Sequence, residues 1–151
     1  MPQAVMLAGD KKAAKRIKNQ NKAFLMFRNE PLFIPVVRAL LETSDVTRID
    51  IVGPVERLTQ SLNSYIPPGK RSKEIVVAEQ GTNILENAKI GFLSTVPSVA
   101  DDKSKPAVAD SVFDSLIGSE LAEHSVLYLS CDIPLATPYE IGQFVSSSDM
   151  E

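Results

Sequence analysis

The sequence contains few of the residues that build several common kinds of site. Cys131 is the single cysteine among 151 residues, which excludes an intramolecular disulfide and a cysteine-rich metal centre. There is one histidine, His124, and no tryptophan, and no Ser/His/Asp or Cys/His arrangement indicates nucleophilic catalysis. No apolar run approaches the ~20 residues that a membrane-spanning helix needs. We therefore expect neither a disulfide scaffold nor a transmembrane protein.

Composition and charge narrow the class further. The formal net charge is −3 and the sequence pI is about 5.2, which argues against a dedicated nucleic-acid surface. Hydrophobic residues make up 44% and charged residues 23%, as in an ordinary globular domain. Lys11 interrupts the first apolar segment before it is long enough for a secretory signal. We expect a single cytoplasmic domain over residues 1–151.

Apolar runs of strand length alternate along the chain with segments of helical periodicity. We expect strands over residues 4–8, 48–53, 74–78 and 126–130, and helices near residues 31–43, 54–62, 83–92 and 109–117 and after Thr137. In the helix after Asn83, we expect Leu85, Ala88 and Phe92 to face inward. This order predicts a three-layer α/β/α sandwich around a mostly parallel, Rossmann-like sheet.

The segment Val126–Leu135 is the most informative part of the sequence. A short apolar run ends in Ser130 and Cys131 and is followed by Asp132, Ile and Pro, which predicts a buried strand with a carboxylate at its tip. Ligands of open α/β sheets bind beyond such tips, and a carboxylate there suits Mg²⁺ or a ribose hydroxyl. Taken alone, Asp132 is better explained as the start of a turn, and Cys131 as a small buried thiol.

Two further segments also follow expected strands. The first strand ends in Ala-Gly, and Gly9 permits positive φ and a close approach of backbone to ligand. Residues 10–22 then carry six Lys or Arg against one Asp, a local charge of +5 that suits phosphates or, alternatively, only solubility. After the third strand, Glu79–Asn83 offers amides and Gly81, which suit the edge of a nucleobase or, alternatively, a helix cap.

In their order and spacing, these segments resemble the nucleotidyltransferases of the glycosyltransferase-A-like fold. This family includes sugar-1-phosphate nucleotidyltransferases and molybdenum-cofactor guanylyl- and cytidylyltransferases. Leu7-Ala8-Gly9 is similar to its opening Leu-Ala-Gly-Gly, and Asn21–Leu25 stands where a Pro-Lys pair is usual. Asn29–Phe33 is similar to its helix start, and Ser130–Leu135 to its Asp-x-Pro segment. The resemblance extends from residue 4 to about residue 145.

The resemblance implies transfer of a nucleoside monophosphate from a nucleoside triphosphate to a phosphorylated small-molecule acceptor, such as a sugar 1-phosphate, with release of pyrophosphate. It implies catalytic roles for Lys22, Arg16 and Asp132, with Asp132 also holding Mg²⁺. The residues that it implies for nucleotide binding are Leu7, Ala8, Gly9, Gln80, Gly81 and Asn87. It implies partners of small-molecule type, not nucleic acid or membrane, and is compatible with an assembly of identical copies.

The sequence also departs from the family. Asp10 replaces the second glycine of the opening motif, and no glycine occurs between Gly9 and Gly53. The family continues well beyond the segment that matches Asp132, with the acceptor-binding half and a second metal-holding carboxylate. We therefore expect the nucleotide-binding part of a longer enzyme, truncated on its C-terminal side, with poor turnover by itself. The alternative is a catalytically degenerate nucleotide-binding or regulatory domain.

Overall fold

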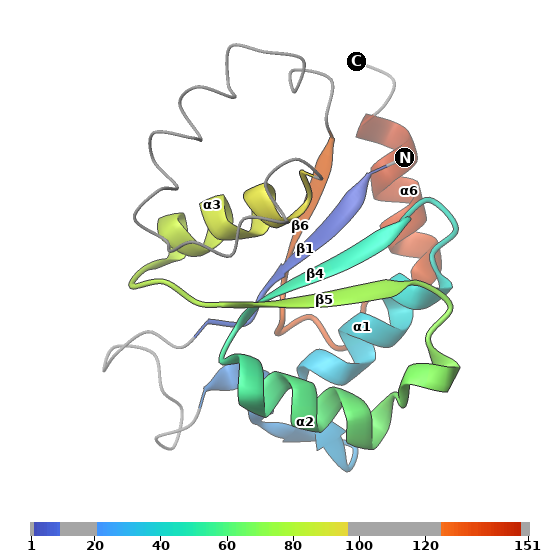
Figure 1. The fold of residues 1–151 in the computed structure, drawn as a ribbon. Helices are drawn as coiled ribbons and strands as arrows, with labels where there is room; N and C mark the ends of the chain where they lie inside the picture. Colours follow the sequence, from blue (N-terminus) through green and yellow to red (C-terminus); the bar gives the residue numbers. More distant parts are fainter. Residues whose placement is uncertain (1, 10–20, 97–124, 149–151) are drawn as a thin grey trace.

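The computed structural model describes residues 2–9, 21–96 and 125–148, and these form an α/β domain. Four strands build one parallel sheet in the order β5-β4-β1-β6 (Figure 1). The strands are β1 (Gln3–Leu7), β4 (Arg48–Gly53), β5 (Glu74–Glu79) and β6 (Val126–Ser130). The helices are α1 (Phe33–Glu42), α2 (Val55–Tyr65), α3 (Ile84–Ser94) and α6 (Pro138–Ser148). The predicted parallel α/β fold is confirmed.

The strand order places a topological switch between β1 and β6. From β1 the chain builds β4 and then β5 on one side, and it later returns to pair β6 with the other side of β1. The segments that follow β1 and β6 leave from adjacent strand ends, and the helices to which they lead, α1 and α6, cover the same face of the sheet (Figure 1). In open α/β sheets, ligands bind beyond the carboxyl ends of the strands.

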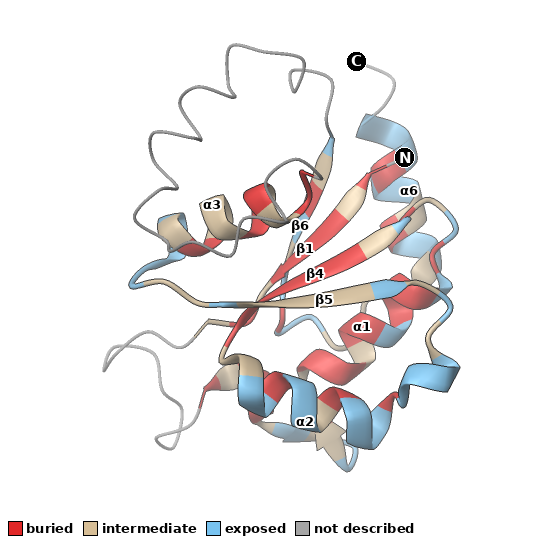
Figure 2. Ribbon diagram, viewed as in Figure 1, coloured by how far each residue is buried: buried red, intermediate tan, exposed pale blue. Residues whose placement is uncertain are grey.

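The two faces of the sheet are covered by different helices. Helices α1, α2 and α6 cover one face, and α3 covers the other (Figure 1). Alternate strand residues such as Met6, Ile49 and Ile51 join the main core with α1 and α2, because successive side chains of a strand point to opposite faces. Figure 2 shows buried residues along β1, β4 and the inner side of α1. The core thus holds the central strands firmly in place.

A short hairpin between β1 and α1 was not predicted. Strands β2 (Met26–Phe27) and β3 (Glu30–Pro31) pair antiparallel. Arg28 and Asn29 between them both have positive φ, 50° and 67°, as the turn of a two-residue hairpin of type I′ requires. Asn tolerates this conformation and Arg does not favour it, so the pattern gave only a weak signal. Pro31 belongs to the second strand of the hairpin, so the helix that was predicted from about residue 31 begins at Phe33.

The inward face predicted for α3 is wrong at its first turn. Leu85 is 65% exposed, whereas Asn87 and Gly91 are buried. A Cβ atom on Gly91 would lie 2.3 Å from Cγ1 of Val5, so the helix packs against β1 at a distance that only glycine allows. This contact sets the rotation of the helix and turns Leu85 outward.

Several sequence predictions fall outside the described residues. These are the departure at Asp10, the catalytic role of Arg16 and the helix near residues 109–117. By contrast, the start of α6 is confirmed. The Thr137 amide and hydroxyl both donate to Glu140, each at 2.9 Å, with Pro138 in the first helical position.

Candidate functional site

The end of β1 is fixed from two sides at the carboxyl edge of the sheet. The Ala8 amide donates to the carbonyl of Val52 at 2.8 Å, which extends the pairing of β1 with β4. The Asn21 side chain donates to the carbonyl of Ala8 at 2.9 Å, and its own oxygen accepts from the Ala23 amide at 3.0 Å. Asn21 is buried and caps the short 3-10 helix Lys22–Phe24. One asparagine thereby brings Lys22 to the end of β1.

On the β4 and β5 side, the predicted nucleotide-binding residues lie together. The Gly81 amide donates to Oδ1 of Asn87 at 2.7 Å. A Cβ atom on Gly9 would lie 2.3 Å from Nδ2 of Asn87 and 3.2 Å from Oε1 of Gln80. The absence of a Cβ atom on Gly9 therefore makes room for the side chains of Gln80 and Asn87. Gly9 does not adopt positive φ, and neither does any other glycine among the described residues. The close approach of this backbone to a ligand stays a prediction.

The turn before α3 is built by helix capping. Oδ1 of Asn83 accepts from the Glu86 amide at 2.9 Å, and the Glu86 carboxylate accepts from the amide and hydroxyl of Thr82 at 2.7 and 2.6 Å. These bonds satisfy donors that a helix start leaves open. Asn83 is thus a cap residue, and Asn87, one turn later, is the α3 side chain that faces Gly9.

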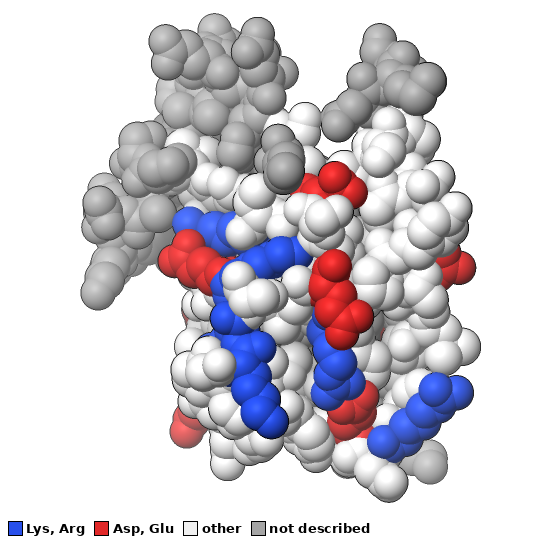
Figure 3. Space-filling model, turned by 90° about the vertical axis from the view of Figure 1, so that its right-hand side faces the viewer, with Lys and Arg blue, Asp and Glu red and all other residues white. Residues whose placement is uncertain are grey.

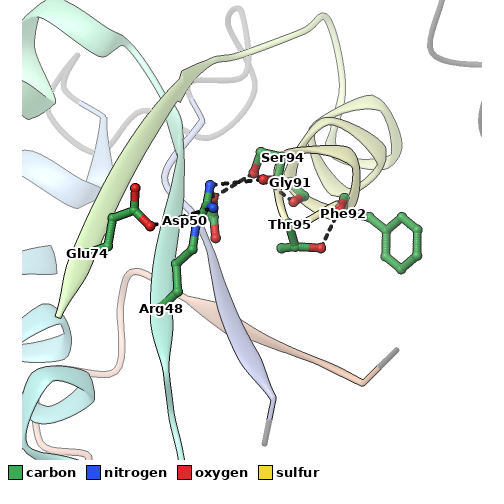
Figure 4. A network of polar contacts seen from close by, with 7 residues as sticks. All are labelled: Arg48, Asp50, Glu74, Gly91, Phe92, Ser94 and Thr95. Carbon is green, nitrogen blue, oxygen red and sulfur yellow. Dashed lines mark hydrogen bonds and ion pairs between the residues drawn. The ribbon is translucent and has the colours of Figure 1, made fainter. Parts of the chain in front are cut away.

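The opposite end of α3 is anchored by a polar network (Figure 4). The Ser94 hydroxyl donates to Oδ1 of Asp50 at 2.8 Å, and Nη2 of Arg48 donates to the same oxygen at 3.0 Å and to the carbonyl of Ser94 at 2.9 Å. Arg48 also lies 3.7 Å from Glu74. Together with Gly91, this network fixes the position of α3, and therefore the place of Asn87 at the site.

On the β6 side, Asp132 meets Lys22 across 110 residues of sequence. Nζ of Lys22 lies 3.3 Å from Oδ2 of Asp132, and the Ser130 hydroxyl donates to Oδ1. The Ser130 hydrogen bond, and then Lys22, hold the pKa of Asp132 below its usual range in spite of partial burial. The carboxylate is charged at neutral pH, and about a third of its side-chain surface is exposed.

The thiol of Cys131 is buried in the core beside this pair. Burial, and secondarily the charge of Asp132, raise the pKa of Cys131 to about 11. A thiol with that pKa is almost entirely protonated at neutral pH and is a poor nucleophile. The interpretation of Cys131 as a small packing residue fits this environment.

The donor set around Asp132 fits Mg²⁺ as a single protein ligand. Mg²⁺ prefers hard oxygen donors, keeps several waters and is commonly held by one or two carboxylates together with substrate phosphates. Asp132 supplies a charged and accessible carboxylate of this kind. Within the described ranges no group of three or more His, Cys, Asp or Glu side chains lies close enough to hold a metal ion. A cation at Asp132 would therefore need phosphate oxygens to complete its coordination.

The surface beside β5 and α1 does not gather charge of one sign. In the view of Figure 3, basic and acidic side chains lie next to one another over this face. Among the described residues, Arg38 pairs with Glu30: two guanidinium nitrogens of Arg38 donate to the two carboxylate oxygens of Glu30 at 2.9 Å each. In the part of the chain that the structure describes, no helix combines the length and apolar character needed to cross a membrane.

Sequence reasoning missed two residues near the site. Asn21 joins η1 to the end of β1, yet in the sequence it was only the residue where the resembling family has proline. Arg57, at the start of α2, places its guanidinium carbon 4.1 Å from the centre of the Phe24 ring. A contact between residues 33 positions apart leaves no local pattern in the sequence. Only the fold brings them together.

No protein-family model and no curated protein sequence matches this chain. Solved structures share its fold. CMP:2-keto-3-deoxy-manno-octonic acid synthetase complexed with CTP matches with a TM-score of 0.51 and 14% identity over 97% of this chain. Rv0371c from Mycobacterium tuberculosis H37Rv matches with a TM-score of 0.56 and 8% identity over 98% of this chain. This chain spans 47% and 62% of the lengths of those two proteins.

Proposed function

We propose that this chain is the nucleotide-binding part of a nucleotidyltransferase. It would transfer a nucleoside monophosphate from a nucleoside triphosphate to a phosphorylated acceptor such as a sugar 1-phosphate, with release of pyrophosphate. The observation that carries the proposal is the meeting of two groups at one sheet edge: the Gly9–Asn87–Gly81 contact, and the Lys22–Asp132 pair. A synthetase of the same fold is known with CTP, which supports a triphosphate as the ligand.

The two groups suit different parts of a nucleotide. Leu7, Ala8 and Gly81 use their backbone groups within the fold and would shape the site, and the side-chain amides of Gln80 and Asn87, which lie against Gly9, would contact the base and ribose. Lys22, with Arg16 from outside the described residues, would neutralise charge on the phosphates. Both groups lie at the carboxyl ends of the parallel strands, so a bound nucleotide would extend along this edge from one group to the other.

The chemistry asks for positioning and charge neutralisation more than for a protein nucleophile. An acceptor phosphate oxygen attacks the α-phosphorus, and the bond to the pyrophosphate oxygen breaks. Lys22 would stabilise the charge that develops on the phosphate oxygens. Asp132 would hold Mg²⁺, which when bound supplies charge neutralisation to the phosphates. The Ser130 hydrogen bond keeps Asp132 ionised for that role.

A second candidate is a nucleotide-binding domain without turnover. The observation that favours it is that Asp132 is already paired with Lys22, and that the described residues contain no group of three or more side chains that could hold a metal ion. Such a domain would bind a nucleotide and regulate a partner, without assembling a complete metal and acceptor site. Binding with no pyrophosphate release under any tested condition would be its signature.

Calorimetric titration of each of the four nucleoside triphosphates, with and without Mg²⁺, tests binding. We expect Lys22→Ala and Asp132→Ala each to lose about 1.5–3 kcal/mol of binding free energy, which corresponds to tenfold to a hundredfold in affinity. The loss in Asp132→Ala should be confined to titrations that contain Mg²⁺. Pyrophosphate release with a panel of sugar 1-phosphates then separates an enzyme from a binding domain.

Glu42→Ala and Lys70→Ala are matched controls. Glu42 ends α1, and Lys70 follows α2, so both lie toward the amino edge of the sheet. Both are exposed, so each substitution removes a charge without touching the site. Equal affinities in the site variants and the controls would reject the roles given to Lys22 and Asp132. A wild-type chain that binds no nucleoside triphosphate would reject the proposed function itself.

A further inference from the structure

Arg57 is held in a defined orientation on an aromatic ring. Its guanidinium carbon lies 4.1 Å from the centre of the Phe24 ring, well within the range of a cation–π contact. The ring is itself fixed, because Phe24 is buried and meets Phe33 edge to face with 5.7 Å between ring centres. A stacked guanidinium keeps its plane while its N–H donors remain available around the edge.

Direct contacts connect Arg57 to the candidate site. The Phe24 amide donates to the carbonyl of Asn21 at 3.0 Å, and the Asn21 side chain in turn donates to Ala8 at the end of β1. On the other side, Gly53 precedes α2 and lies so close to Ala8 that a Cβ atom would be 2.9 Å from the Ala8 carbonyl oxygen. Two independent routes therefore place the start of α2 beside the segment that leaves β1.

The charge of Arg57 is not used within the described fold. Among the described residues, Arg38 and Arg48 each form ion pairs with carboxylates, and no carboxylate lies within ion-pair distance of Arg57. Lys22, the other described cation of the site, is already paired with Asp132. An exposed arginine that stacks on a buried ring, and that has no acidic partner in the part of the chain that the structure describes, is available to bind an anion from solution.

We infer that Arg57 is a phosphate-binding residue of this site, which contacts the outer phosphates of a nucleoside triphosphate and uses Phe24 as its platform. The inference rests on the proposed function for the existence of a triphosphate ligand. It adds a cation from α2 to a site otherwise built from segments that follow β1, β5 and β6. A planar fork that donates to two phosphate oxygens would fix the direction of the outer phosphates more firmly than Lys22 alone.

The test is the affinity of the full chain for a nucleoside triphosphate, diphosphate and monophosphate of one base, measured calorimetrically with Mg²⁺. We expect Arg57→Gln to weaken triphosphate binding on the order of tenfold and to leave monophosphate binding nearly unchanged. Arg57→Lys keeps the charge and loses the fork, and it should recover only part of the affinity. Lys70→Gln is the charge-matched control, because Lys70 lies between α2 and β5 at the amino edge.

The outcomes separate this inference from the proposal beneath it. Tight triphosphate binding that is the same in Arg57→Gln and Lys70→Gln would overturn the role of Arg57 and leave the proposed function standing. An equal loss for triphosphate and monophosphate would also overturn it, because an outer-phosphate contact cannot act on a ligand that lacks those phosphates. No binding by the wild-type chain would overturn both.

Discussion

Asp50 and Asp132 have the same kinds of partners in opposite surroundings. Each carboxylate accepts a hydrogen bond from a serine hydroxyl, Ser94 or Ser130, and each faces a cation, Arg48 or Lys22. Asp50 is fully buried under α3, whereas Asp132 stands at the carboxyl edge with about a third of its side chain exposed. Burial raises the pKa of Asp50 in spite of its partners, while Ser130 and Lys22 lower that of Asp132.

The difference indicates which carboxylate is structural and which is open to a ligand. Removing water from a carboxylate costs free energy that a serine and a cation offset only in part, and Oδ2 of Asp50 has no hydrogen-bond partner among the described residues. Asp50 therefore fixes α3 to the sheet and offers little to a ligand. Asp132 keeps its charge and is partly exposed to solvent, as a metal-binding carboxylate requires.

The largest expected effect on stability is that of Asp50→Ala. It removes the partner of Arg48 in the interior, and breaking a buried pair typically costs 3–5 kcal/mol. Arg48 keeps Glu74 and the Ser94 carbonyl, so we expect a loss near the lower limit, about 3 kcal/mol in the free energy of unfolding. Urea denaturation measures it. Asp132→Ala should change the free energy of unfolding by less than about 0.5 kcal/mol. Similar losses in both variants would contradict the distinction between a structural Asp50 and an exposed Asp132.

The serines give a second and smaller contrast. Ser94→Ala leaves the buried Asp50 without one of its two partners, and we expect a loss of about 1.5 kcal/mol in unfolding free energy. Ser130→Ala should cost less than about 0.5 kcal/mol, because its site is exposed to water. Ser130→Ala should instead raise the pKa of Asp132, because the Ser130 hydrogen bond is the main cause that lowers this pKa. Carboxyl titration by NMR in both variants checks this assignment.

Much of the fold could be predicted from local patterns. Apolar runs located the four parallel strands, and the Thr137–Glu140 and Asn83–Glu86 pairs located two helix starts, because capping depends on residues three apart in sequence. The hairpin could not be predicted, because Arg28 adopts positive φ against its preference. The orientation of α3 was predicted wrongly at Leu85, because the contact of Gly91 with Val5 sets the rotation of the helix and apolar periodicity does not.

At the site, the sequence predicted which segments meet but not how they are joined. Residues that follow parallel strands share one edge, so the proximity of Gly9 to Gln80 and Asn87 follows from topology. The Lys22–Asp132 pair depends instead on Asn21, whose hydrogen bond to Ala8 places Lys22 there. These contacts join residues that are far apart in the sequence, so no local pattern predicts them. The roles assigned to these residues stay predictions.

The pH dependence of stability should have opposite signs at the two aspartates. The pKa of Asp50 is raised, so its contribution favours the folded state below the unfolded pKa, near 3.8, and is lost as pH rises through the folded pKa. The pKa of Asp132 is lowered, so its contribution is present above 3.8 and is lost as pH falls through the folded pKa. As the pH rises from 3 toward neutrality, the wild type should therefore lose stability relative to Asp50→Asn. Over the same range it should gain stability relative to Asp132→Asn, by less than about 1 kcal/mol because the Asp132 pair is screened by solvent. Urea denaturation over a pH series measures both, and the same sign in both variants would contradict the comparison.

The smallest effect should appear at the thiol of Cys131. Burial is the first cause that raises its pKa to about 11, and the negative charge of Asp132 is the second. Asp132→Asn removes that charge, so the thiol pKa should fall while staying above its ordinary value. The pH dependence of alkylation, followed with a chelator present, measures this shift without ambiguity because the chain has a single cysteine. Asp50→Asn is the control, since Asp50 faces α3 while Cys131 belongs to the core on the other side of the sheet. An unchanged thiol pKa in Asp132→Asn would mean that the Asp132 carboxylate does not act on Cys131 as a nearby charge.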